Sequence, residues 1–158
     1  MKKIFLISIL SMALINCSSD DSNNESFTPQ NIDFETIGQG QIITIINTEE
    51  EQNNIVITNE SDWNQLVEEL FFRMEEFPDL GAEELPTEID FNTFQVIVSV
   101  DEVRPSLSNW LKITNIIENE ENITVTILKE WDDFGFQALC QPYHIVKIPK
   151  SDKPVVFE

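Results

Sequence analysis

The chain has 158 residues, of which 41% are hydrophobic, and its 29 acidic and 9 basic residues give a formal net charge of −20. This hydrophobic fraction is sufficient for one folded core and argues against a fully disordered chain, and the negative charge excludes nucleic acid as a partner because it would repel the phosphate backbone. One histidine and two cysteines are too few for a common zinc site, and the four glycines form no phosphate-binding loop.

Residues 1–16 are predicted to be a lipoprotein signal peptide. Lys2 and Lys3 precede an apolar run from Ile4 to Ile15, which is too short to span a bilayer as a helix. Cys17 follows this run directly and resembles the cysteine of the bacterial lipoprotein box, which implies lipidation of Cys17. Loss of the two lysines would change the net charge from −20 to −22.

The segment 17–33 is predicted to be a flexible acidic tether. Its first part, Ser18–Ser26, contains no aliphatic or aromatic side chain and cannot bury apolar surface. Acidic residues close to a lipidated cysteine resemble the surface-export signal of Bacteroidetes lipoproteins, although a plain solvated linker has the same composition. We therefore expect a lipid-anchored protein of the outer membrane, displayed at the cell surface or in the periplasm.

The folded domain is expected to begin at residue 34 with two strands. Residues 41–46 and 55–58 are rich in β-branched residues and are separated by the polar segment 47–54, which predicts an antiparallel hairpin. The segment Gly38-Gln39-Gly40 is expected to interrupt the chain before the first of these strands.

A helix is predicted next, from the change to a spacing of three and four residues. Ser61 is the expected N-cap, and Asp62 is favourable in the first turn. The apolar stripe, expected to pack on a sheet, consists of Trp63, Leu66, Val67, Leu70, Phe71 and Met74. Residues 75–88 are predicted to be an acidic surface loop, because their carboxylates lack the regular spacing of a calcium-binding loop.

The remainder of the chain is predicted to be mainly strand. Strands are expected at 94–100, 109–117, 122–131, 143–148 and 155–157, and the second and third of these form a pair around a short polar turn. On 94–100, valines occupy one face and Ile97 the other, so both faces should be covered. The sum predicts an α+β domain over 34–158, with an antiparallel twisted sheet of six to eight strands and one main helix on one face.

The sequence contains no recognisable catalytic set. Cys140 and His144 are four residues apart in an extended segment, roughly 13 Å along a strand, so a local Cys–His dyad is excluded. Paired carboxylates are abundant, which leaves glycosidase chemistry open by residue type alone. We predict that the chain is not an enzyme and has no cofactor.

The candidate interaction surface consists of one arginine and the aromatic residues around two connections. Arg104 and Trp110 lie in or after the connection that follows residue 100, and Trp131, Phe134 and Phe136 surround the Asp132-Asp133 tip. Aromatic residues at a loop-rich edge are typical binding anchors. The alternative is that these side chains cap the core and that Arg104 pairs with a neighbouring glutamate.

A family resemblance extends over residues 55–157. The segments Glu88–Val100 and Gln141–Pro149, the latter with the sequence QPYHIVKIP, resemble the C-terminal domain of PrcB-type protease-complex subunits. The segment Ser61–Leu66 is similar to the tryptophan-bearing helix that precedes that domain, whereas Pro105–Trp110 departs from the family's Gly-Gly-Tyr turn. The resemblance implies a non-catalytic lipoprotein that supports a surface serine protease.

Two hypotheses from different classes follow. The first is a lipid-anchored envelope protein that binds a protein partner, such as a protease, without catalysis. The alternative is a small-ligand or glycan-binding lipoprotein that uses Trp110 and Trp131 as a stacking platform. In both, the membrane is contacted only through the lipid.

Overall fold

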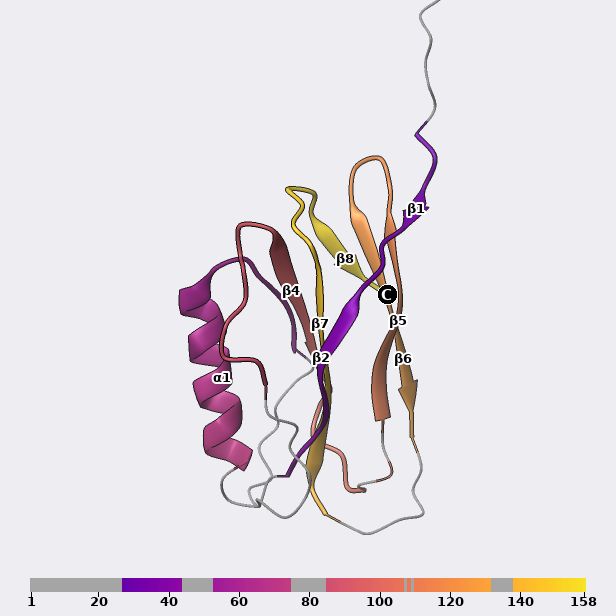
Figure 1. The fold of residues 1–158 in the computed structure, drawn as a ribbon. Coiled ribbons are helices and arrows are strands. Elements are labelled where there is room, and N and C mark those ends of the chain that lie inside the picture. Colours follow the sequence, from indigo (N-terminus) through magenta and orange to yellow (C-terminus); the bar gives the residue numbers. More distant parts are fainter. Residues whose placement is uncertain (1–26, 44–52, 75–84, 107, 109, 132–137) are drawn as a thin grey trace, which may run out of the picture.

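The computed structural model describes residues 27–43, 53–74, 85–106, 108, 110–131 and 138–158. Within these residues the chain forms eight strands and one helix (Figure 1). In chain order the elements are β1 (Gln30–Asn31), β2 (Glu35–Ile43), β3 (Asn53–Ile57), α1 (Glu60–Met74), β4 (Phe94–Val100), β5 (Trp110–Glu118), β6 (Ile123–Glu130), β7 (Cys140–Pro149) and β8 (Val155–Phe157).

The strands form two sheets, and Figure 1 shows them as adjacent layers with α1 outside one of them. Sheet A has the order β1-β5-β6-β8, and sheet B has the order β2-β7-β4-β3. The α+β class and one helix on a sheet face are therefore confirmed, but the strands are divided between two four-stranded sheets and do not form one large sheet. All pairs are antiparallel except β6 with β8, which is parallel.

Two hydrophobic clusters hold the layers together, one on each face of sheet B. The cluster on the helix side includes Trp63, Val96 and Val98, and the cluster between the sheets includes Ile97 and Val146. The predicted alternation along β4 is confirmed, because its valines and Ile97 contribute to opposite clusters. The β5–β6 pair is also confirmed, with a register shift between Ile113 and Asn115.

The predicted hairpin between the first two long strands is wrong. β2 pairs with β7 and β3 pairs with β4, so β2 and β3 lie at opposite edges of sheet B. Two strands from later in the chain lie between them, because β4 and β7 are apolar on both faces and need the covered centre of the sheet. Residues 44–52, which connect β2 to β3, lie outside the described residues.

The first strands begin earlier than predicted. Gln30 and Asn31, assigned to the tether, pair with Glu118 and Ile117 of β5, and Ile32 packs against the cluster between the sheets. Backbone pairing needs no apolar side chain, which is why composition placed these residues in the tether. The expected interruption at Gly38–Gly40 is wrong, because these residues lie inside β2; a Cβ on Gly38 would collide with the Leu85 side chain.

The helix begins at Glu60, and its N-cap lies two residues before Ser61, the predicted cap. Asn59 is the N-cap: its Oδ1 accepts a hydrogen bond from the Asp62 backbone N–H at 3.0 Å, and its Nδ2 donates to the Asp62 carboxylate at 2.8 Å. Trp63 is fully buried and donates from Nε1 to the Pro86 carbonyl at 3.1 Å. Leu66 and Val67 pack against the same cluster, and the side chains at 70–74 and all of 75–84 lie outside the described residues.

The cap assignment predicts that Asn59→Ala lowers the free energy of unfolding by about 1 kcal/mol, because the Asp62 N–H loses its acceptor. Ser61→Ala is the matched control and should have an effect several times smaller. Urea denaturation followed by circular dichroism measures both variants. A larger loss for Ser61→Ala than for Asn59→Ala would contradict the assignment.

Candidate functional site

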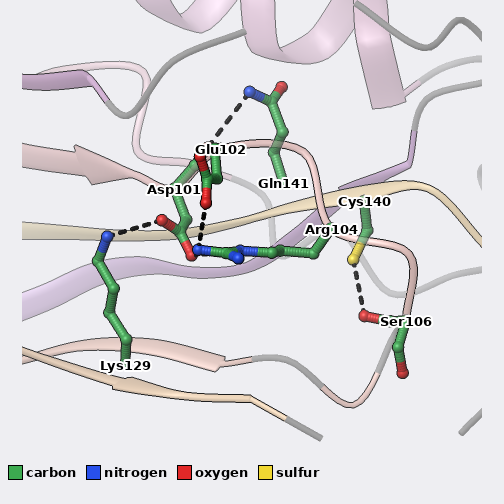
Figure 2. Close-up of polar contacts among 7 residues, drawn as sticks. All are labelled: Asp101, Glu102, Arg104, Ser106, Lys129, Cys140 and Gln141. Carbon is green, nitrogen blue, oxygen red and sulfur yellow. Dashed lines mark hydrogen bonds and ion pairs between the residues drawn. The ribbon is translucent and has the colours of Figure 1, made fainter. Parts of the chain in front are cut away.

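A polar cluster lies where the connection after β4 runs beside the start of β7 (Figure 2). Asp101 N donates to the Pro142 carbonyl at 2.8 Å, and Arg104 and Cys140 exchange two backbone hydrogen bonds of 2.7 and 2.8 Å. Gln141 Nε2 also donates to the Asp101 carbonyl at 3.3 Å. These bonds fix residues 101–104 to sheet B, so their side chains have defined positions.

Asp101 is the centre of this cluster. Its side chain is fully buried, and its two carboxylate oxygens accept from Lys129 Nζ at 2.8 Å and from Arg104 Nε at 3.3 Å. Burial alone would raise the pKa of Asp101, but the hydrogen bond and charge of Lys129, with a smaller contribution from Arg104, hold this pKa below its ordinary value. Asp101 therefore stays ionised at neutral pH and holds both cations in place.

Arg104 connects the buried carboxylate to the surface. Its guanidinium also contacts the Glu102 carboxylate, and its Cζ lies 4.2 Å from the centre of the Trp131 ring. This distance is within the range of a cation–π contact. Trp131 nevertheless remains 60% exposed, so its position is fixed from beneath while one ring face stays accessible.

The predicted surface residues are only partly brought together. Arg104 and Trp131 are in contact, whereas Trp110, 54% exposed, lies opposite Glu130 on the outer face of sheet A. Trp131 follows the last residue of β6, so the strand pairing does not place its side chain beside Trp110. Phe134 and Phe136 lie outside the described residues, and so does Cys17.

Cys140 is a buried thiol at the edge of the polar cluster. Its Sγ donates to the Ser106 carbonyl at 3.1 Å (Figure 2). Burial, and then the negative charge of Asp101, raise the pKa of Cys140 to about 11. The thiol is therefore protonated at neutral pH and is a poor nucleophile.

His144 joins the two sheets. Its Nδ1 accepts a hydrogen bond from the Ile113 N–H of β5 at 2.8 Å, so the neutral ring carries its proton on Nε2, which lies 2.9 Å from Thr36 Oγ1. Burial, and then the charge of Lys112, lower the pKa of His144 to about 4. The two ring nitrogens connect His144 to β5 and to β2, and neither contacts Cys140.

Two members of the cluster escaped the sequence analysis, although each left a signal. Lys129 occupies an inward position of β6, in line with Ile127, where the alternation calls for an apolar residue. A lysine at such a position needs an acidic partner. Asp101 directly follows β4 and precedes Arg104 by three residues, which is a spacing that allows a local ion pair.

Comparisons with known proteins found no matching family model, curated protein or solved structure. Within the described residues, no helix has the length and apolar content needed to cross a membrane. The same part of the chain contains no group of three or more histidine, cysteine, aspartate or glutamate side chains arranged to hold a metal ion.

The position of His144 predicts acid sensitivity. Its folded-state pKa of about 4 lies below the ordinary value of 6.5, so the unfolded chain takes up the proton first as the pH falls. The stabilisation is complete above about pH 6.5 and is lost progressively toward pH 4, where the total loss reaches roughly 3 kcal/mol. Urea denaturation at a series of pH values measures this loss.

The control is His144→Gln, which offers an acceptor and a donor but does not titrate in this range. Its stability at neutral pH is expected to be lower, but the difference from the natural chain should shrink as the pH falls from 6.5 to 4. Parallel pH profiles for the two proteins would show that the histidine does not control the acid response.

Proposed function

We propose that this chain is a non-catalytic, lipid-anchored protein of the cell envelope that binds a protein partner through the surface around Trp131 and Arg104. The observation that carries the proposal is the exposed Trp131 ring, held on the Arg104 guanidinium, which is itself held by the buried carboxylate of Asp101. We name these three residues the Trp131 anchor.

The physical argument is preorganisation. Tryptophan and arginine contribute disproportionately to protein interfaces, and an exposed side chain that is already fixed loses less conformational entropy on binding. A solvent-exposed tryptophan normally has no such support. Here the supporting charge is ionised at neutral pH because Lys129 and Arg104 both stabilise it.

The proposal that the protein is not an enzyme is supported by the states of the two side chains most suited to catalysis. Cys140 is protonated and hydrogen-bonded to a carbonyl, and His144 is neutral with both nitrogens engaged. The protease as partner class derives from the resemblance of Gln141–Pro149 to PrcB-type subunits. An accessory subunit of a surface protease is thus the specific form of the proposal.

The envelope location predicts that Cys17 carries the anchor. Cys17→Ala should shift the chain from the membrane pellet to the soluble fraction of a native host, because no acylated cysteine remains to hold it in the bilayer. Mass spectrometry of the natural chain should find a diacyl or triacyl modification on an N-terminal Cys17. An unmodified Cys17 in the mature chain would refute the anchor.

The partner proposal predicts that a stoichiometric protein co-purifies with the natural chain from gently solubilised membranes. Trp131→Ala should raise the dissociation constant for this partner at least tenfold, which corresponds to about 1.4 kcal/mol of binding free energy, and should reduce its recovery accordingly. Val156→Ala is the matched control, because Val156 is also an exposed apolar side chain but lies on β8. Equal recovery with both variants would exclude the Trp131 anchor as the contact.

The glycan-binding alternative requires Trp110 and Trp131 to act together as a stacking platform. A stacking platform would need an open face on both tryptophan rings, whereas Arg104 covers one side of the Trp131 ring. Titration of tryptophan fluorescence against a glycan panel distinguishes the two functions. A saturable response that requires both tryptophans would favour the alternative.

A further inference from the structure

The two sheets differ in how well their edges are protected against pairing with another chain. An unprotected edge offers unpaired N–H and C=O groups to any extended segment, and proteins usually shorten, bend or cover such strands. β1 has two residues and β8 has three, so neither offers a long template. β2 is longer, but its register shifts between Thr36 and Gly38, which bends the strand.

The part of β5 that extends beyond β1 is covered by side chains of the other sheet. Leu111 O accepts from Gln39 Nε2 at 3.3 Å, and the Ile113 N–H donates to His144 at 2.8 Å. These contacts occupy backbone groups that a new strand would need. The edge of sheet A next to β5 is therefore blocked.

Within the described part of the chain, the half of β3 from Ile55 to Ile57 shows none of these protections. The strand is five residues long, pairs with β4 without a register shift and contains neither a charged residue nor a proline. Among the residues that the structure describes, no strand pairs with Ile55, Val56 or Ile57 on the side away from β4. Ile55 and Val56 are only partly buried, so apolar side chains of an added strand would find apolar neighbours on both faces.

The negative charge beside β3 favours a basic partner segment over a second copy of this acidic chain as the added strand. Glu60 and Asp62 are exposed in the first turn of α1, close to the end of β3 at Ile57. A second copy of this chain would bring the same acidic groups and a further net charge of −20. A segment with basic residues at the end that lies beside Ile57 would instead be attracted.

We propose that Ile55–Ile57 is a docking edge that accepts an extended segment of a partner protein as a fifth strand of sheet B, with alternate apolar side chains and basic residues beside Glu60. Main-chain hydrogen bonds supply the affinity in this mode, and side chains supply the register. The inference goes beyond the Trp131 anchor, because it concerns a different surface and stands without it.

The test uses fluorescently labelled ten-residue peptides and the full chain in detergent. The probe alternates valine and threonine and begins with two lysines, which an antiparallel approach would place beside Ile57. A second peptide carries glutamates in place of the lysines, and a third has the lysines but two central prolines. The third controls for the general attraction of a basic peptide to an acidic chain, since proline cannot donate to a strand edge.

We expect saturable binding of the probe by fluorescence anisotropy, at least tenfold weaker binding of the other two peptides, and slowed hydrogen exchange of amides in residues 55–57. Val56→Lys should weaken the probe at least tenfold, whereas Val156→Lys and Trp131→Ala should not. Because the hydrogen-exchange measurement uses the natural chain, it remains decisive if Val56→Lys fails to fold.

Three results would overturn the proposal. They are equal affinity for the proline peptide, probe-dependent protection in a region other than β3, and self-association of the natural chain that Val56→Lys dissolves. The last of these would show that a second copy occupies the edge.

Discussion

The structure depends on the burial of sheet B from both sides. β7 lies between β2 and β4 within that sheet, and α1 with its cluster covers one face while sheet A covers the other. Every side chain from Cys140 to Val146 is consequently buried. A polar group in such a strand needs a partner, because burial without one costs more free energy than a hydrogen bond returns.

This requirement explains why polar contacts between layers occur where they do. His144 points from β7 toward sheet A and accepts from β5, so one buried ring satisfies a backbone donor that a strand edge would otherwise expose. Asp101 and Lys129 form a second link at the end of the sheets, with Arg104 extending it to the surface. The candidate surface is thus anchored in the same interface that holds the two sheets together.

The sequence predicted those elements whose burial or pairing is determined by residues close together in the chain. β4 was predictable with both faces because seven consecutive residues carry its alternation, and β5 with β6 because a short polar turn joins them. The partners of β2 and β3 were not, because the choice between an adjacent strand and one a hundred residues later depends on the covered centre of the sheet. For the site, Arg104 and Trp131 were predictable as unusual surface residues. Their contact depends on Asp101, whose spacing from Arg104 indicates the ion pair but not its complete burial.

The short strand β1 has a mechanical consequence. The chain passes from sheet A to sheet B between Asn31 and Glu35. A pull from residues before β1 therefore first meets two residue pairs and the packing of Ile32 and Phe34, and then the eight pairs of β2 with β7. Tension would release β1 before β2 and lengthen the free N-terminal segment by roughly 17 Å, at about 3.4 Å for each of the released residues 30–34. The rest of the domain would then resist extension at β2, so β1 would yield first to a force applied from the N-terminal side.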